Sequence, residues 1–178
     1  VIIHSLDKKV FCAGANIKML GQASHEHKVN FCKFTNETRN EIENATSRSH
    51  QIYICAIEGA CAGGGYEIAL ACDEIIMVDD GSTSISLPEL PLLGVLPGTG
   101  GLTRLVDKRK VRRDHADFFC TTEEGLLAPR ALKWGLVDHI APPSKFKELL
   151  YSRTSSLAKK KKRKSLDNGI SLTPLQRK

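Results

Sequence analysis

Two glutamates in the middle of the chain, Glu67 and Glu89, have the residue type and the setting for acid–base chemistry. Glu67 follows a glycine triplet at residues 63–65, and Glu89 follows Pro88. Two carboxyl groups can act as general acid and general base when their surroundings separate their pKa values. A single glutamate at either place is more often a helix-start acid or an ordinary loop carboxylate. The hypothesis of a catalytic pair therefore depends on the segments around them.

Eight glycines form two clusters near these glutamates, at positions 59, 63, 64 and 65 and at positions 94, 98, 100 and 101. Glycines at a strand-to-helix turn let the backbone approach a ligand closely and leave N–H groups free to donate. The common nucleotide motifs do not fit, because G-x-x-x-x-G-K-[ST] is absent and residues 98–103 lack the third glycine of G-x-G-x-x-G.

Alternating strand and helix patterns predict an α/β fold with a largely parallel sheet. Strands are expected at residues 1–6, 52–57, 75–78 and 136–140. Helices are expected at residues 25–49, 63–72, 110–120, 129–134 and 144–158. Within the first of these helices, the expected packing positions are Val29, Phe31, Phe34 and Ile42. Residues 10–20 are expected to form a loop leading into a short helix, and residues 87–101 a Pro- and Gly-punctuated loop.

The composition fits one globular domain of 178 residues, of which 41% are hydrophobic and 26% are charged. No apolar run is long enough to span a bilayer. The net charge of +6 comes from residues 159–178, which carry eight Lys or Arg and one acid, so the body does not have the basic surface of a nucleic-acid binder. The six cysteines show neither C-x-x-C spacing nor a zinc grouping. These features predict a cytoplasmic protein without disulfides or a metal.

We expect the chain to divide into a core at residues 1–142, a C-terminal helix at residues 143–158 and a basic, disordered tail at residues 159–178. The first residues, VIIHS, have the pattern of a strand interior rather than that of a signal peptide. The chain is therefore expected to be a fragment that lacks its beginning.

Three segments in this order resemble the crotonase (enoyl-CoA hydratase/isomerase) superfamily: FCAGANI at residues 11–17, IEGACAGGGYEIALACD at residues 57–73 and LPELPLLGVLPGTGGLTRL at residues 87–105. APRALKWGLVD at residues 128–138 is similar to that family's terminal helix and strand, so the resemblance covers roughly residues 1–140. It implies the ClpP/crotonase spiral of ββα units with C-terminal helices, here with the N-terminal strands missing.

The resemblance also implies roles for the backbone at small residues. Thioester chemistry places negative charge on the carbonyl oxygen, and Ala15 and Gly64 match the two N–H donors of the family's oxyanion hole. Ala13 matches the backbone that holds the bent CoA moiety. The expected substrate-binding residues are Ala13, Gly14, Gly63 and Gly65.

Finer detail is similar to the benzoyl-CoA-dihydrodiol lyases within that superfamily, notably VNFCKFTNETRN at residues 29–40 and DKRKVRRDHAD at residues 107–117. That resemblance implies ring opening of 2,3-epoxybenzoyl-CoA with two waters, giving 3,4-dehydroadipyl-CoA semialdehyde and formate. No metal or redox cofactor is implied, since CoA is part of the substrate. Glu67 and Glu89 would be the catalytic residues, and the sequence leaves open which is the acid and which is the base.

Two alternatives remain. A generic enoyl-CoA hydratase or isomerase would use the same oxyanion hole and glutamates on a linear acyl chain. A non-catalytic remnant would bind CoA or a partner subunit. The expected partner is an acyl-CoA thioester rather than a nucleic acid or a membrane, and the resemblance implies a homo-oligomer.

Overall fold

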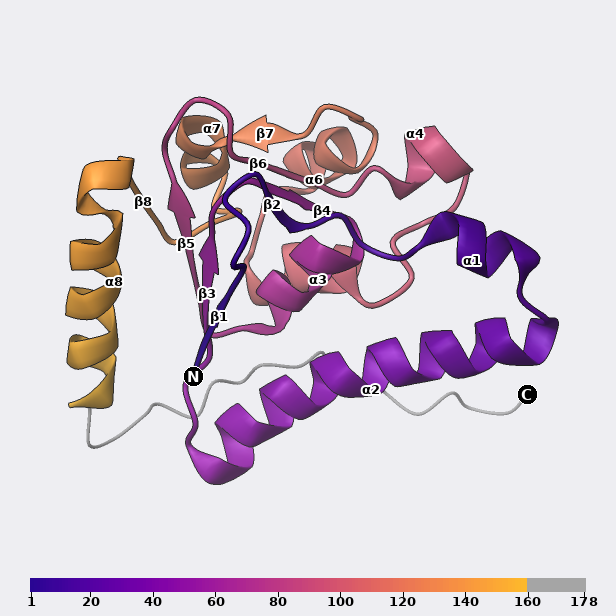
Figure 1. Ribbon diagram of the computed structural model, residues 1–178, viewed down its shortest axis with the longest axis horizontal. Helices are drawn as coiled ribbons and strands as arrows, with labels where there is room; N and C mark the ends of the chain where they lie inside the picture. The colour runs from indigo at the N-terminus through magenta and orange to yellow at the C-terminus, as the bar shows by residue number, and fades with distance from the viewer. Residues whose placement is uncertain (160–178) are drawn as a thin grey trace.

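The first six strands along the chain alternate between two four-stranded sheets (Figure 1). The computed structural model describes residues 1–159. The first sheet has the order β1-β3-β5-β8 with all neighbours parallel, and consists of β1 (Ile2–His4), β3 (Ile54–Ile57), β5 (Glu74–Val78) and β8 (His139–Ala141). The second has the order β2-β4-β6-β7 and consists of β2 (Val10–Cys12), β4 (Ala60–Ala62), β6 (Ser84–Ser86) and β7 (Leu126–Leu127), of which only β6 and β7 pair antiparallel.

The first three turns of the chain each add one strand to each sheet and then form a helix, which confirms the predicted α/β spiral of ββα units. β3 and β4 lead into α3 (Gly64–Ala71), and β5 and β6 lead into α4 (Glu89–Leu93). The other helices are α1 (Ile17–Gln22), α2 (His25–Ser49), α5 (Gly101–Thr103), the π-helical turn η1 (Arg104–Lys108), α6 (Arg113–Cys120), α7 (Ala128–Lys133) and α8 (Pro143–Ala158).

The strands of the second sheet are the part of the fold that the sequence patterns do not predict. The expected loop at residues 10–20 contains β2, and β4 and β6 have no counterpart among the predicted strands. Each is three residues long, which is too short to display an alternating pattern. The expected loop at residues 87–101 likewise contains α4, so Glu89 is the first residue of a helix.

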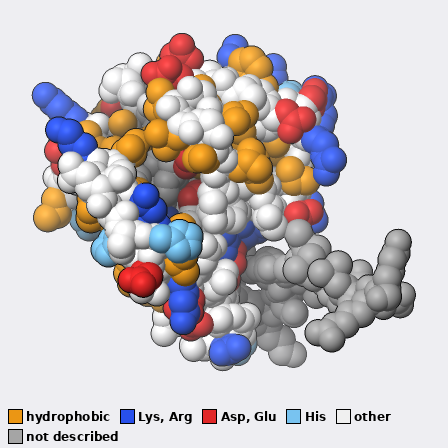
Figure 2. All heavy atoms as spheres, turned by 90° about the vertical axis from the view of Figure 1, so that its right-hand side faces the viewer, with side chains coloured by type: hydrophobic (Ala, Val, Ile, Leu, Met, Phe, Trp, Pro, Cys, Tyr) orange, Lys and Arg blue, Asp and Glu red, His pale blue; other side chains and the backbone are white. Residues whose placement is uncertain are grey.

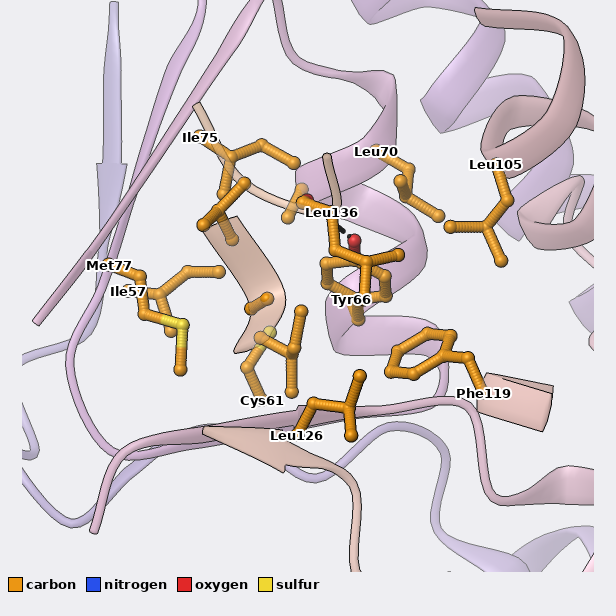
Figure 3. Close-up of a cluster of buried hydrophobic side chains, with 14 of the residues drawn as sticks. Ile57, Cys61, Tyr66, Leu70, Ile75, Met77, Leu105, Phe119, Leu126 and Leu136 are labelled. Atoms are coloured by element: carbon orange, nitrogen blue, oxygen red, sulfur yellow. Dashed lines mark hydrogen bonds between the residues drawn. The ribbon is translucent and has the colours of Figure 1, made fainter. Parts of the chain in front are cut away.

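A single large cluster of buried side chains fixes α3 against both sheets (Figure 3). Tyr66 and Phe119 are fully buried and pack edge-to-face with 5.6 Å between ring centroids. The Tyr66 hydroxyl donates to the carbonyl oxygen of Leu136 at 2.7 Å, and burial raises the pKa of that hydroxyl. Burying one large apolar side chain contributes about 1.5–3 kcal/mol, so this cluster holds the first turn of α3 in a fixed place.

Helix α2 buries polar side chains where an apolar face is expected. Ser24 caps its start by accepting a hydrogen bond from the His27 N–H at 3.2 Å. Its buried residues are Arg39 and Thr46. Val29 and Phe34 are 52% and 67% exposed, so the prediction that they pack in the core is wrong. In Figure 1 the N-terminal half of α2 extends past α3 toward α1, where no sheet lies against it.

Helix α8 packs against β8 and β5 and buries Phe146 in a second, smaller apolar cluster. Arg153 of this helix also pairs with Glu74 at 2.7 Å. The predicted basic tail at residues 159–178 lies outside the described residues, apart from Lys159. No helix within residues 1–159 combines the length and the apolarity that crossing a membrane requires.

Gly65 is required by packing, because a β-carbon there would lie 2.5 Å from the carbonyl oxygen of Cys12 in β2. Backbone of a paired strand cannot move aside easily, so we expect Gly65→Ala to lower the free energy of unfolding by about 1–3 kcal/mol. Gly21→Ala in α1 is the matched control, since nothing lies within 4 Å of its β-carbon position. Alanine there should be neutral or stabilising by up to about 1 kcal/mol. Urea denaturation measures both, and an equal loss in the two variants would contradict the close packing of α3 on β2.

Candidate active site

Three parallel strands bring the predicted site residues to one edge of the second sheet. β2, β4 and β6 lie side by side, with Val10 paired to Ala60 and Cys61 paired to Ile85. The hydrogen bonding continues past the strand ends, because the Gly63 N–H donates to the carbonyl oxygen of Ser86 at 2.9 Å. The carboxyl ends of parallel strands meet at the same edge of a sheet. The loop after β2, the start of α3 and the start of α4 are therefore neighbours.

The loop after β2 lies directly against the backbone at the start of α3. Gly14 has a φ of +84°, and a β-carbon there would lie 3.2 Å from both the Ala62 carbonyl oxygen and the Gly64 nitrogen. Glycine at this position thus permits the close approach of two backbone segments. Ala13 and Ala15, on either side of it, are exposed. Both residues are therefore accessible to a ligand.

Asn16 ends this loop and fixes the direction in which the chain leaves it. Its side-chain oxygen accepts a hydrogen bond from the Met19 N–H at 3.0 Å and so caps α1. Asparagine is among the strongest N-cap residues, which holds the loop in place without adding a charge beside the site.

Gly64 is the first residue of α3, so its N–H has no acceptor within the helix. The dipole of α3 favours negative charge at the same point. Since the loop at Gly14 abuts the Gly64 nitrogen, Ala15 and Gly64 belong to adjoining backbone segments. Two backbone donors can therefore converge on one oxygen, which is the arrangement that an oxyanion hole needs. The roles of Ala15 and Gly64 themselves stay predictions.

The two glycines beside Gly64 meet different demands. A β-carbon on Gly63, whose φ is +55°, would lie 3.0 Å from Oε1 of Glu89, so glycine leaves room for that carboxyl. Gly65 is buried against Cys12, and packing alone explains the need for glycine there. Contact of Gly63 and Gly65 with a substrate stays a prediction.

The Glu67 carboxylate is 3% exposed and is held by three donors from the third segment. Its Oε1 accepts hydrogen bonds from the N–H groups of Thr99 and Gly101, each at 3.0 Å. Its Oε2 accepts a short hydrogen bond from the Thr99 hydroxyl. A carboxylate has about four acceptor sites, so Oε2 keeps one for a water or a substrate group. Glu67 is thus oriented firmly while one acceptor position stays open.

The Glu89 carboxyl lies in contrasting surroundings. Its Oε2 is buried and finds no hydrogen-bond partner among residues 1–159. Burial raises the pKa of Glu89, and the negative charge of nearby Glu67 raises it further, although a backbone hydrogen bond within Glu89 opposes both effects. A raised pKa favours the protonated carboxyl and suits a general acid. Glu67 and Glu89 therefore have the unlike environments that an acid–base pair requires.

A buried cluster of charges that the sequence did not reveal holds Thr99 in place. Arg104, only 8% exposed, donates to the Thr99 carbonyl oxygen and to both carboxylate oxygens of Glu43, each at 2.9 Å. Lys108 also donates to Glu43 at 3.0 Å. Burial alone would raise the pKa of Glu43, but the hydrogen bonds and charges of Arg104 and Lys108 outweigh it and lower that pKa. Helix α2 thereby anchors the segment that binds Glu67.

Arg39 is a second site residue to which the sequence patterns assign no role. Its side chain is 4% exposed and reaches from α2 to the first turn of α3, where Nη2 donates to the Gly64 carbonyl oxygen at 2.6 Å. The one available signal is its position four residues before Glu43, which places two charges on a single helix face. An apolar residue would be expected on the inward face of such a helix.

Metal ligands do not gather in the part of the chain that the structure describes. Among residues 1–159, no group of three or more His, Cys, Asp or Glu side chains is arranged to hold a metal ion. The expectation of a reaction without a metal or redox cofactor stays a prediction.

Exposed apolar side chains lie on the face that carries α1 and α4. Figure 2 views this face and shows hydrophobic side chains gathered across its upper part. The exposed residues of these elements and of the loop after α4 are Ile17, Met19, Leu90, Leu92, Leu93, Val95 and Leu96. Apolar surface of this extent is typical of a face that binds a ligand or another protein segment.

The family described as enoyl-CoA hydratase/isomerase matches residues 1–167. A benzoyl-CoA-dihydrodiol lyase of Aromatoleum evansii is 55% identical over 177 residues, which are 99% of this chain and 32% of the lyase. A fatty acid oxidation complex subunit alpha of Shewanella loihica is 34% identical over 154 residues, which are 81% of this chain and 20% of that protein. The chain thus spans 32% of the length of the lyase that it matches.

Solved structures share the fold. The crystal structure of an enoyl-CoA hydratase from Geobacillus kaustophilus superposes with a TM-score of 0.78 at 40% identity, covering 88% of this chain and 56% of that one. An enoyl-CoA hydratase from Bacillus anthracis gives a TM-score of 0.76 at 30% identity, covering 88% and 57%. The spiral of two sheets is therefore common to this chain and to just over half of each hydratase.

The half-buried Glu89 carboxyl predicts a pH-dependent stability. Because its pKa in the folded chain lies above the ordinary value of 4.5, the folded state binds this proton more tightly than the unfolded state does. The wild type therefore loses stability as the pH rises from about 4.5 through the folded-state pKa. Glu89→Gln has no such proton to lose. We expect the variant to melt at a higher temperature than the wild type at about pH 8, with the difference vanishing near pH 4.

Thermal melts across this pH range measure the effect. Glu148→Gln, an exposed glutamate on α8, is the control and should follow the wild type throughout. A Glu89→Gln chain without any gain in melting temperature at high pH would contradict a raised pKa of Glu89 in the folded chain.

Proposed function

Because the chain belongs to the enoyl-CoA hydratase/isomerase (crotonase) family, we propose that it is a ring-opening lyase for a CoA thioester. The proposed substrate is 2,3-epoxybenzoyl-CoA, and the proposed products are 3,4-dehydroadipyl-CoA semialdehyde and formate. The observation that carries this choice is the 55% identity, over 99% of the chain, to a benzoyl-CoA-dihydrodiol lyase. The unlike carboxyls of Glu67, held by Thr99 and Gly101, and of Glu89, beside Gly63, supply the chemistry.

The backbone at the strand ends polarises the thioester. The N–H groups of Ala15 and Gly64 donate to the thioester carbonyl oxygen and stabilise the negative charge that develops there. One preorganised donor of this kind is worth about 3–4 kcal/mol of barrier. The exposure of Ala13 and the partial exposure of Gly14 support binding of the CoA moiety beside this oxygen. The start of α3 contributes its dipole in the same direction.

The two glutamates divide the proton transfers. Glu89 donates a proton to the epoxide oxygen as its carbon–oxygen bond breaks, a role that its burial and raised pKa support. Glu67 orients and deprotonates an attacking water through the free acceptor site of Oε2. Thr99 and Gly101 keep the Glu67 carboxylate aligned during this step. Two waters are consumed in all, and the ring carbon that is lost leaves as formate.

Hydration of a linear enoyl-CoA is the second candidate. It is favoured by the 40% identity to the hydratase of Geobacillus kaustophilus, and it would use the same two donors and the same pair of carboxyls. Binding without turnover is the third possibility, since the chain spans 32% of the lyase that it matches. Turnover measurements with 2,3-epoxybenzoyl-CoA and crotonyl-CoA distinguish the lyase, the hydratase and the binding remnant.

We also propose that copies of the chain associate. The exposed apolar residues of α1 and α4 support this, because association would remove them from water. The oligomeric state and the cytoplasmic location both stay predictions.

Formate release from 2,3-epoxybenzoyl-CoA by the purified chain tests the proposal. We expect Glu67→Gln and Glu89→Gln each to lower kcat by about 100- to 10,000-fold, because each removes one proton-transfer group. Glu148→Gln carries the same change on the exposed surface of α8 and should keep wild-type turnover.

Turnover of crotonyl-CoA, with no formate released from 2,3-epoxybenzoyl-CoA, would indicate a hydratase of linear enoyl-CoA chains instead of the lyase. A folded wild-type chain that binds CoA thioesters but converts neither substrate would favour the binding remnant. Wild-type rates in both glutamine variants would refute the two-carboxyl mechanism.

A further inference from the structure

Arg39 is a buried cation beside the proposed oxyanion donor. Its side chain is 4% exposed, although arginine is almost never buried without paired groups. It bridges two helices, since Nη1 donates to the Thr35 carbonyl oxygen of α2 at 2.8 Å and Nη2 donates to the Gly64 carbonyl oxygen of α3 at 2.6 Å. Neither acceptor is a carboxylate, so the guanidinium charge has no ion-pair partner among these hydrogen bonds.

The same guanidinium lies close to Gly64 itself. A β-carbon on Gly64 would lie 3.2 Å from Nη2 of Arg39. The cation is therefore next to the residue whose N–H faces the proposed thioester oxygen. The Glu67 carboxylate also attracts Arg39, which partly offsets the effect of burial in lowering the pKa of the guanidinium. Arginine stays charged at neutral pH even after such a shift.

Arg39 is also poorly satisfied for a structural residue. Its Nε is buried and finds no hydrogen-bond partner within the described residues 1–159. An unpaired buried N–H on a charged group is expensive, and an apolar side chain would pack here without that penalty. A purely structural position would favour leucine or methionine. A buried charge with an unsatisfied N–H at this point calls for an electrostatic reason.

We propose that Arg39 is a positioning residue for the oxyanion hole: it fixes the Gly64 peptide and places a buried positive charge behind the Gly64 N–H. Holding the Gly64 carbonyl oxygen fixes the rotation of the first turn of α3. The N–H vector of Gly64 is then set before the substrate arrives. Because the Arg39 guanidinium is itself buried, its charge also favours negative charge on the thioester oxygen more than an exposed charge would.

This inference rests on the proposed function, because it takes a thioester oxygen to bind at Gly64. If Arg39 acts on the oxyanion hole, replacing it changes the polarisation of the bound thioester carbonyl. A merely structural role of Arg39 would not produce that change. Benzoyl-CoA labelled with ¹³C at the carbonyl is an unreactive probe of that state. The infrared stretch of its carbonyl falls in frequency when donors polarise it.

The experiment compares this stretch in complexes with the full 178-residue chain and with variants at Arg39. We expect a downshift with the wild type, at most half of that downshift with Arg39→Met, and an intermediate value with Arg39→Lys, which keeps the charge but loses the planar fork. For formate release, kcat should fall about 100-fold in Arg39→Met while KM changes little. Arg39→Lys should recover part of the loss, and it also keeps the test open if Arg39→Met does not fold.

Arg109→Met is the matched control. The Arg109 side chain is 9% exposed and also donates to a backbone carbonyl oxygen, that of Gly135 at 2.7 Å, but its other partner is Asp138 and it lies outside the proposed site. Its loss should leave the carbonyl shift and kcat of the folded fraction unchanged.

Three results decide the matter. A folded Arg39→Met or Arg39→Lys chain with the full wild-type shift would overturn the role of Arg39 alone. A wild-type chain that leaves the carbonyl at its solution frequency would overturn the proposed function, and this inference with it. A wild-type shift without formate release would overturn the reaction while leaving Arg39 to be judged by the infrared shift.

Discussion

The hydrogen-bonded register of three short parallel strands decides where every proposed site group lies. β2, β4 and β6 contribute three residues each, yet their pairing brings the ends of three distant segments to one sheet edge. The bond from the Gly63 N–H to Ser86 extends this register to the turn that starts α3. A shift of one residue in any of these strands would separate the Gly64 N–H from the Ala15 loop. The close approach at Gly14 and Gly65, which no larger residue would permit, enforces that register.

At this sheet edge, the carboxyls of Glu67 and Glu89 have opposite surroundings. Three hydrogen bonds hold Glu67 to Thr99 and Gly101. Arg104, which pairs with Glu43, in turn holds the Thr99 carbonyl oxygen. Glu89 has a buried oxygen without a partner among residues 1–159. One carboxyl is thus rigid and supplied with donors, and the other is free to hold or release a proton. Unlike surroundings of this kind are what let two identical side chains perform different steps.

The sequence predicts the long helices and the chemistry of the site better than it predicts the sheet that makes the site possible. The helices α2, α3 and α8 lie close to their predicted ranges, because each has enough residues to show a helical pattern. The sequence does not predict β2, β4 and β6, because three residues are too few to show an alternating hydrophobic pattern. The stability of these strands comes from neighbours far along the chain. Arg39 and Arg104 escape prediction for a related reason. Their partners, Gly64 and Glu43, lie 25 and 61 residues away, and only the fold brings these pairs together.

The central claim is that the Ala15 and Gly64 N–H groups converge on one thioester oxygen. Two-dimensional ¹H–¹⁵N NMR of the chain, titrated with unreactive benzoyl-CoA, tests it most directly. The amide protons of Ala15 and Gly64 should both move downfield, together and saturably, as the thioester carbonyl oxygen accepts hydrogen bonds from them. Saturable binding that leaves these two amide resonances unmoved, while others shift, would contradict it.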